Sequence, residues 1–213
     1  MILLDLLYPP RCIFCHDFVA NGKILVCESC KRGLPFTVDG GRQKAPFVSA
    51  AIAPFYYEKT VRESLHRFKF SGCTGYAKGY APYVADLVRK EYGDTFDLLS
   101  WVPVSRKRLR KRGYDQAELL AKAVGKQLGI RPVRTLKKIR DTAPQSLAGS
   151  AEKRKSNIAG AYAPYHPERF SGKRVLLIDD IFTTGSTVSE CARTLGLAGA
   201  ERVLCASVAR SRS

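Results

Sequence analysis

The chain has 213 residues, 45% of them hydrophobic, which is enough for one α/β domain of ordinary size and a small appendage. No apolar run approaches the roughly 20 residues of a transmembrane helix, and the leucine-rich start lacks the features of a signal peptide, so we expect a cytoplasmic protein without membrane insertion. The net charge of +17 fits polyanionic partners, either nucleic acid or a pyrophosphate ligand, although basic surfaces also occur without such a role.

Four of the seven cysteines form two C-x2-C pairs near the N-terminus, Cys12 with Cys15 and Cys27 with Cys30. Four thiolates in this spacing suit one tetrahedral ion, and zinc is the usual choice for such a structural site. Disulfides are the alternative, which a cytosolic location disfavours. Residues 12–16 also spell the C-x-x-C-H haem-attachment motif, but that chemistry requires export and leaves the second pair unused.

A segment of about 40 residues buries little apolar surface, so a metal would supply its folding free energy. Glycine and proline residues after Cys30 mark a linker. We therefore predict a double-knuckle zinc-ribbon module over residues 1–42 and a second domain over residues 43–213.

Apolar periodicity from residue 45 onward predicts strands that alternate with helices, as in an α/β domain with a mostly parallel central sheet flanked by helices. Asp115 is the expected N-cap of one helix, and Gly129 its end. The expected strands lie within 45–57 and at 98–104, 133–139, 175–178 and 202–208, and the expected helices at 60–70, 76–92, 116–128 and 188–195.

Six of the eight residues from Ser105 to Arg112 are basic, and this run follows the strand predicted at 98–104. Ligands of open α/β sheets bind at the carboxyl ends of the strands, and the forked donors of arginine suit a pyrophosphate. A solvated charge run is the alternative. We predict a pyrophosphate-binding loop that uses Ser105, Arg106, Lys107, Arg108 and Arg112.

Residues 175–187 read VLLIDDIFTTGST, which combines a short apolar strand, two acids and a loop of hydroxyl residues before a helix. Ionised carboxylates only accept hydrogen bonds, so Asp179 and Asp180 suit the two hydroxyls of a ribose. Amide groups at a helix N-terminus favour a phosphate, and glycine permits its close approach. An ordinary strand-to-helix turn is the alternative. The predicted phosphate loop consists of Thr183, Thr184, Gly185, Ser186 and Thr187.

This run resembles the phosphoribosyl pyrophosphate signature of type I phosphoribosyltransferases. In that family the acids hold the ribose hydroxyls, the following loop holds the 5-phosphate, and a loop after an earlier strand binds the pyrophosphate. Residues 102–117, VPVSRKRLRKRGYDQA, with the cysteine pairs, resemble more narrowly the ComF/GntX family of competence-type proteins. Residues 140–147 resemble the flexible loop of that family, which can close over the ligand, with Arg140 and Gln145 as its candidate residues.

The resemblance implies a type I phosphoribosyltransferase-like fold and a protein that binds phosphoribosyl pyrophosphate with Mg²⁺. It also implies a role with single-stranded DNA, during DNA uptake in natural transformation. Two alternatives stay open. One is an active Mg²⁺-dependent phosphoribosyltransferase acting on a base or another small acceptor, with Asp179, Asp180 and Arg140 as catalytic residues. The other is a regulator whose zinc module docks a protein partner, such as a DNA-uptake motor or helicase.

Overall fold

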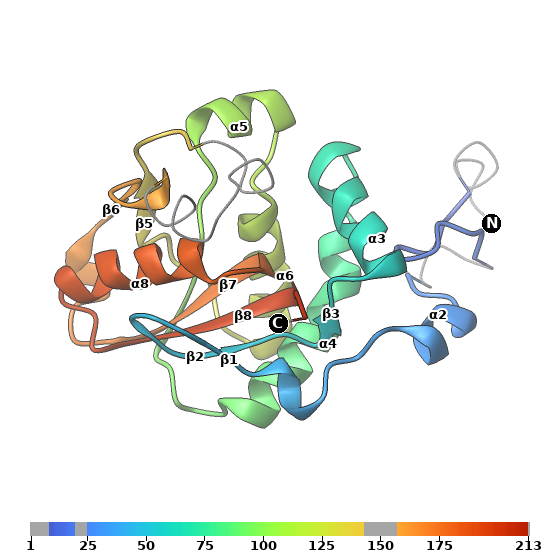
Figure 1. The fold of residues 1–213 in the computed structure, drawn as a ribbon, viewed down its shortest axis with the longest axis horizontal. Coiled ribbons are helices and arrows are strands. Elements are labelled where there is room, and N and C mark those ends of the chain that lie inside the picture. Colours follow the sequence, from blue (N-terminus) through green and yellow to red (C-terminus); the bar gives the residue numbers. More distant parts are fainter. Residues whose placement is uncertain (1–8, 20–24, 143–156, 213) are drawn as a thin grey trace.

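The computed structural model describes residues 9–19, 25–142 and 157–212 (Figure 1). Most of its strands form one central sheet, and most of its helices pack on the two faces of that sheet. In chain order they are α2 (Glu28–Gly33), η1 (Asp39–Gly41), β1 (Gln43–Ala45), β2 (Val48–Ile52), β3 (Phe55–Tyr56), α3 (Lys59–Phe70), α4 (Tyr76–Glu91), β4 (Leu98–Trp101), α5 (Arg106–Arg112), α6 (Gln116–Leu128), β5 (Leu136–Lys138), β6 (Tyr162–Pro164), η3 (Pro167–Arg169), β7 (Arg174–Phe182), α8 (Ser186–Leu197) and β8 (Arg202–Arg210).

The central sheet has the strand order β1-β2-β8-β7-β4, and β3 also pairs with β8. All of its pairings are parallel except that of β1 with β2, which confirms the predicted mostly parallel sheet. Alternate residues of β7 face opposite sides of the sheet. Leu176 and Ile178 lie in the core cluster with α3, α4 and α6, whereas Val175 and Leu177 lie in the cluster with α8. Helices therefore cover both faces.

Four predicted elements differ from the structure. The strand expected within 45–57 is three short strands, and the one expected at 133–139 is β5, which pairs with β6 in a separate antiparallel sheet. The expected basic loop is the helix α5, because Ser105 caps it by accepting from the Arg108 amide at 3.3 Å and Gly113 ends it with φ of 82°. β7 continues past the acids because its ladder with β8 extends to Phe182.

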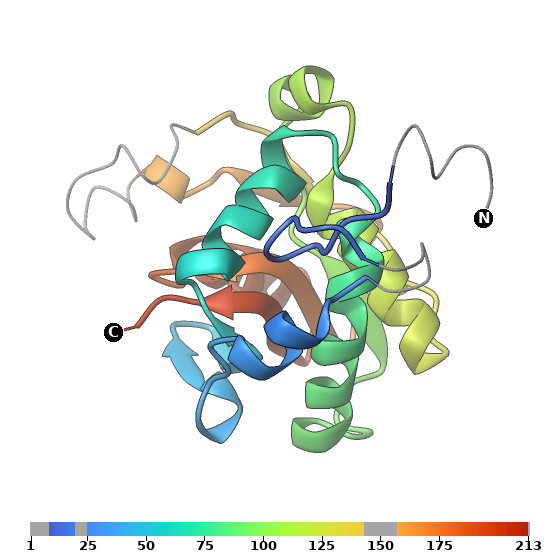
Figure 2. The same cartoon turned by 90° about the vertical axis from the view of Figure 1, so that its right-hand side faces the viewer.

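The N-terminal cysteine segment packs against α3 and α4 (Figure 2). The Phe14 ring contacts the rings of Phe55 and Tyr80 edge-on, with centroid distances of 5.6 and 5.8 Å. A Cβ on Gly79 would lie 2.5 Å from Cδ1 of Ile13, so glycine lets α4 approach this segment closely. One hydrophobic core thus crosses the predicted boundary at residue 42, and the division into two domains stays a prediction.

Within the described ranges, every helix is too short or too polar to cross a lipid bilayer.

Candidate functional site

The acid pair lies near the end of β7 and is buried, with Asp179 8% and Asp180 4% exposed. The backbone N–H of Asp180 donates to Oδ1 of Asp179 over 2.8 Å. Because successive strand residues point to opposite faces, Asp180 lies on the α3 side of the sheet and Asp179 on the α8 side. The two carboxylates therefore lie on opposite sides of β7 near its C-terminal end.

Lys69, in the last turn of α3, forms an ion pair with the acid pair. Its Nζ lies 2.9 Å from Oδ2 of Asp180, without the alignment of a hydrogen bond, and its side chain is 22% exposed. Burial and the neighbouring charge of Asp180 raise the pKa of Asp179 well above its ordinary value. Lys69 partly offsets this by its positive charge. No local pattern in the sequence indicates a site role for this lysine. It lies four residues after buried Leu65, at the edge of the buried face of α3.

The predicted phosphate loop connects β7 to α8 and lines a small pocket together with Asp179. The hydroxyls of Thr184 and Ser186 lie 2.9 Å apart at the start of α8. Gly185 has φ of 72°, and a Cβ there would lie 2.7 Å from Cζ of Phe182 and 2.9 Å from Cβ of Ala45. The turn itself therefore requires glycine at this position.

Gly185→Ala is expected to destabilise the protein by about 1–2 kcal/mol, the cost of a left-handed residue with a Cβ, and the contacts with Phe182 and Ala45 add to this cost. Chemical denaturation measures the change. Gly196→Ala on the same helix is the control, because nothing lies within 4 Å of its Cβ position, and this variant should not lose stability. Equal stability of both variants would contradict the account of the turn.

The helix α5 separates the predicted pyrophosphate ligands into two groups. Arg108 and Arg112 are half-buried, whereas Arg106 and Lys107 are exposed. The hydroxyl of Ser105 donates to Oδ1 of Asp141 over 2.6 Å, and this bond lowers the pKa of Asp141. The guanidinium of Arg108 donates to the carbonyl of Thr142 over 2.8 Å.

Arg112, the last residue of α5, contacts the end of α3 and interacts electrostatically with Asp180. Its guanidinium donates to the side chain of Gln116 and lies 5.0 Å from the centroid of the Phe70 ring. Burial lowers its pKa, and the negative charge of Asp180 opposes that change. The structure therefore brings Arg112 into the electrostatic field of the acids, although the two residues are far apart in the sequence.

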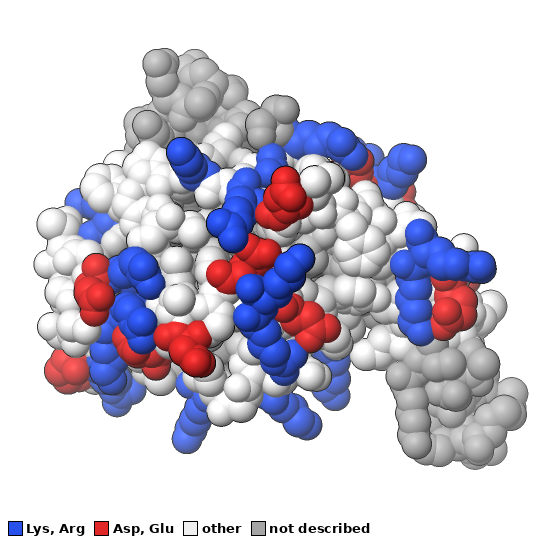
Figure 3. Space-filling model, turned by 90° about the horizontal axis from the view of Figure 1, so that it is seen from below, with Lys and Arg blue, Asp and Glu red and all other residues white. Residues whose placement is uncertain are grey.

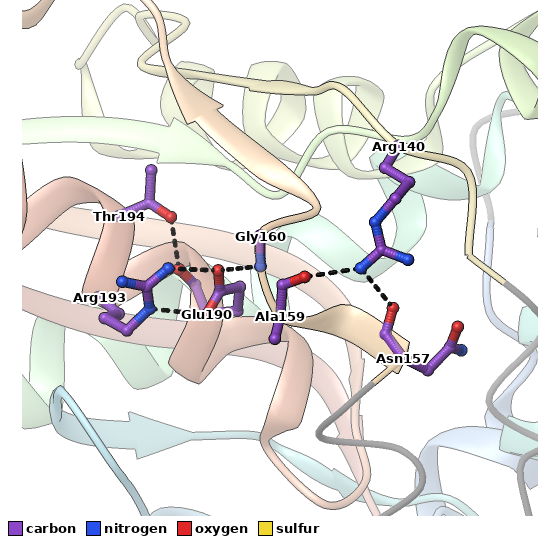
Figure 4. Close-up of polar contacts among 7 residues, drawn as sticks. All are labelled: Arg140, Asn157, Ala159, Gly160, Glu190, Arg193 and Thr194. Atoms are coloured by element: carbon purple, nitrogen blue, oxygen red, sulfur yellow. Dashed lines mark hydrogen bonds and ion pairs between the residues drawn. The ribbon is translucent and has the colours of Figure 1, made fainter.

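Arg140 anchors the backbone that follows residue 156 (Figure 4). Its Nη2 donates to the carbonyls of Asn157 over 3.1 Å and Ala159 over 2.6 Å. The next amide, Gly160 N–H, donates to Glu190 of α8 over 2.7 Å. Arg140 thus has structural contacts, and its catalytic role stays a prediction. Most of the predicted loop, including Gln145, lies outside the described residues.

The four N-terminal cysteines converge, with all Sγ atoms within 4.8 Å of one another. Amides point at the sulfurs: Cys27 N–H donates to Sγ of Cys12 and Cys30 N–H to Sγ of Cys27, each over 3.4 Å. Burial raises the pKa of Cys12, but backbone donors led by Cys27 outweigh this and bring it to about 7. Convergent sulfurs that receive amide donors fit a tetrahedral zinc ion, as predicted.

Two protein families match separate regions of the chain. Residues 3–41 match the double zinc ribbon domain, and residues 114–213 match the phosphoribosyl transferase domain. Two solved structures are similar over 61% of this chain: the allosteric regulatory enzyme of purine biosynthesis (20% identity, TM-score 0.39) and glutamine phosphoribosylpyrophosphate amidotransferase from B. subtilis (21%, TM-score 0.40). The chain covers 24% and 25% of those longer chains.

Curated relatives cover most of the chain. Competence protein ComFC of Streptococcus pneumoniae is 30% identical over 74% of this chain and 67% of its own length. Competence protein F of Haemophilus influenzae is 25% identical over 94% of this chain and 97% of its own, and the DNA utilization protein YhgH of Escherichia coli K12 is 29% identical over 92% and 94%. The chain therefore belongs to the ComF family of competence proteins, with a double zinc ribbon ahead of a phosphoribosyltransferase domain.

Proposed function

We propose that this protein binds phosphoribosyl pyrophosphate as its Mg²⁺ complex and acts on single-stranded DNA during DNA uptake. The observation that carries the ligand site is the buried acid pair, Asp179 and Asp180, beside a pocket at the N-terminus of the twelve-residue helix α8. Acceptor-only carboxylates next to the N-terminus of a helix match a ribose diol next to a phosphate.

Each part of the ligand has a counterpart in the site. The carboxylates of Asp179 and Asp180 accept from the ribose hydroxyls, and the loop 183–187 receives the 5-phosphate. The inner residues of α5, Arg108 and Arg112, face the pyrophosphate, whose remaining charge Mg²⁺ neutralises. Lys69 balances the charge of Asp180 while no ligand is bound.

The DNA role is supported by the relatives and by the charge of the chain. The relatives are named for competence and DNA utilization, and a net charge of +17 attracts polyanions. Phosphoribosyl transfer to an acceptor, and docking of an uptake motor through the zinc ribbon, stay alternatives. Release of pyrophosphate from the donor in the presence of DNA or a base would identify an enzyme.

Calorimetric titration with phosphoribosyl pyrophosphate and Mg²⁺ tests the ligand site. Wild-type protein is expected to bind, and Asp180→Ala to bind more weakly by about 1.5–3 kcal/mol, the worth of a hydrogen bond to a charged group. Asp86→Ala is the matched control, because it removes an exposed acid on α4. Equal affinity of Asp180→Ala and the control would contradict the diol role, and no binding by wild-type protein would reject the ligand.

A further inference from the structure

The last residue of α3, Phe70, has an aromatic ring that is 63% exposed. The guanidinium of Arg112 lies 5.0 Å from the ring centroid, and the ring of His66 lies 4.8 Å away, centroid to centroid. These two neighbours hold the ring at the junction of α3 and α5, while most of its surface faces solvent. The attraction between the Arg112 guanidinium and the ring helps to hold Phe70 in place, so that the ring forms an aromatic platform.

The basic residues of α5 flank this platform. Residues four apart in a helix share a face, so Arg108 and Arg112 lie together on the inner side. The outer side has four exposed cations that form no ion pair with any residue of the described ranges: Arg106, Lys107, Arg110 and Lys111. We call Phe70 with these four residues the α5 surface.

The opposite side of the molecule has a different charge pattern. Figure 3, seen from below Figure 1 and so from the side away from α5, shows Asp and Glu interspersed among the Lys and Arg side chains. Mixed charges of this kind give little net attraction for a polyanion. The α5 surface has four cations, and its helix contains no acidic residue, so it presents a positive potential to a polyanion.

We propose that the α5 surface binds single-stranded nucleic acid, with phosphates along the outer side of α5 and one base stacked on Phe70. This inference rests on the proposed DNA role and adds the place and the mode of binding. A single strand is favoured because its bases expose their faces, whereas a duplex hides them in the stack. Proteins that bind single strands without sequence preference combine aromatic rings, on which bases stack, with basic side chains that contact the phosphates.

Fluorescence anisotropy with a labelled oligothymidylate of about 20 nucleotides, longer than one small binding domain occupies, tests the stacking. Phe70→Ala is expected to weaken binding roughly 5- to 150-fold, as for the loss of one stacked base. Phe47→Ala is the matched control, because it removes a ring that is 65% exposed elsewhere on the surface. Equal affinities of these two variants would overturn the proposal.

The charge contribution is measured by the salt dependence of binding. Arg110→Ala with Lys111→Ala is expected to reduce the slope of log K against log salt by roughly 1.4, about 0.7 for each lost single-strand phosphate contact. The matched control removes two exposed lysines near the ends of α4 and α6, with Lys90→Ala and Lys126→Ala, and should leave the slope almost unchanged. An unchanged slope for the α5 variant would overturn the proposal.

Two further measurements separate this inference from the proposed function. Equal affinity of wild-type protein for a duplex of the same length would overturn base stacking. Wild-type protein that binds the sugar donor but no oligothymidylate would reject the DNA role and this surface together. Oligothymidylate binding that depends on Phe70, in protein that does not bind the donor, would support the surface and reject only the donor site.

Discussion

Loss of the metal from the four-cysteine site is expected to lower the melting temperature of the whole chain in a single transition. Structural zinc contributes roughly 10–16 kcal/mol of apparent binding free energy in small zinc peptides, so we expect Cys27→Ser with Cys30→Ser to cost about 5 kcal/mol or more. For a chain of this length, that corresponds to roughly 10–20 °C. The whole chain responds because Ile13 and Phe14, between the first two cysteines, are buried in the main core.

Metal analysis together with thermal unfolding checks this result. We expect about one zinc per chain in the wild-type protein, by the tetrathiolate stoichiometry, and none in the double variant. Cys73→Ser is the control, since Cys73 is a free cysteine outside the cluster and its loss should change neither zinc content nor melting. A separate low-temperature transition in the double variant would instead show that residues 1–42 unfold independently.

The four-cysteine site and the acid pair near the end of β7 could be located from the sequence because the residues of each lie close together in the chain. Two close cysteine pairs define a tetrahedral site without tertiary information, and the run from Val175 to Thr187 holds a strand, acids and a helix start together. The geometry of the acids could not be predicted in the same way. The strand was expected to end at Ile178, directly before the acids. Its ladder with β8 continues to Phe182, and only the pairing with the neighbouring strand determines that.

Local sequence patterns could not predict contacts between segments that are far apart in the chain. Charge composition suggested that residues 105–112 form a loop, although arginine and lysine are good helix formers and Ser105 is a good cap. The ion pair of Lys69 with Asp180 joins residues more than a hundred positions apart, so no spacing rule indicates it. A catalytic role was predicted for Arg140 because residues 140–147 resemble the flexible loop of the family, whereas its described contacts are with backbone carbonyls.

The raised pKa of Asp179 has a consequence for stability. Burial and the charge of Asp180 make the folded state hold this proton more tightly than the unfolded state does. The contribution of Asp179 to stability is therefore most favourable below its ordinary pKa of 3.8 and is lost as the pH rises through the raised value. The pKa of Asp97 is shifted in the opposite direction, because hydrogen bonds from Arg174 lower it. The contribution of Asp97 to stability is therefore present above its ordinary pKa and is lost as the pH falls through the lowered value.

Asp179→Asn is accordingly expected to stabilise the ligand-free protein at neutral pH while it weakens binding of the sugar donor. Asparagine keeps an oxygen to accept from the Asp180 amide but removes a buried charge, so we expect a gain of roughly 0.5–2 kcal/mol, or about 1–8 °C. Donor binding should weaken by about 1.5–3 kcal/mol because one charged acceptor is lost.

Thermal unfolding from pH 4 to 8, with calorimetric titration of the donor at neutral pH, measures both effects in one variant. The stability gain should shrink as the pH falls through the raised pKa of Asp179, because the wild-type side chain takes up a proton there. Asp97→Asn is the matched control and should lower the neutral-pH melting temperature without changing donor affinity, because its partner Arg174 lies at the start of β7, away from the acids. If Asp179→Asn melted below wild type while binding the donor normally, the acid would be a structural residue, and a site that sacrifices folding stability for ligand binding would be the wrong description of this strand end.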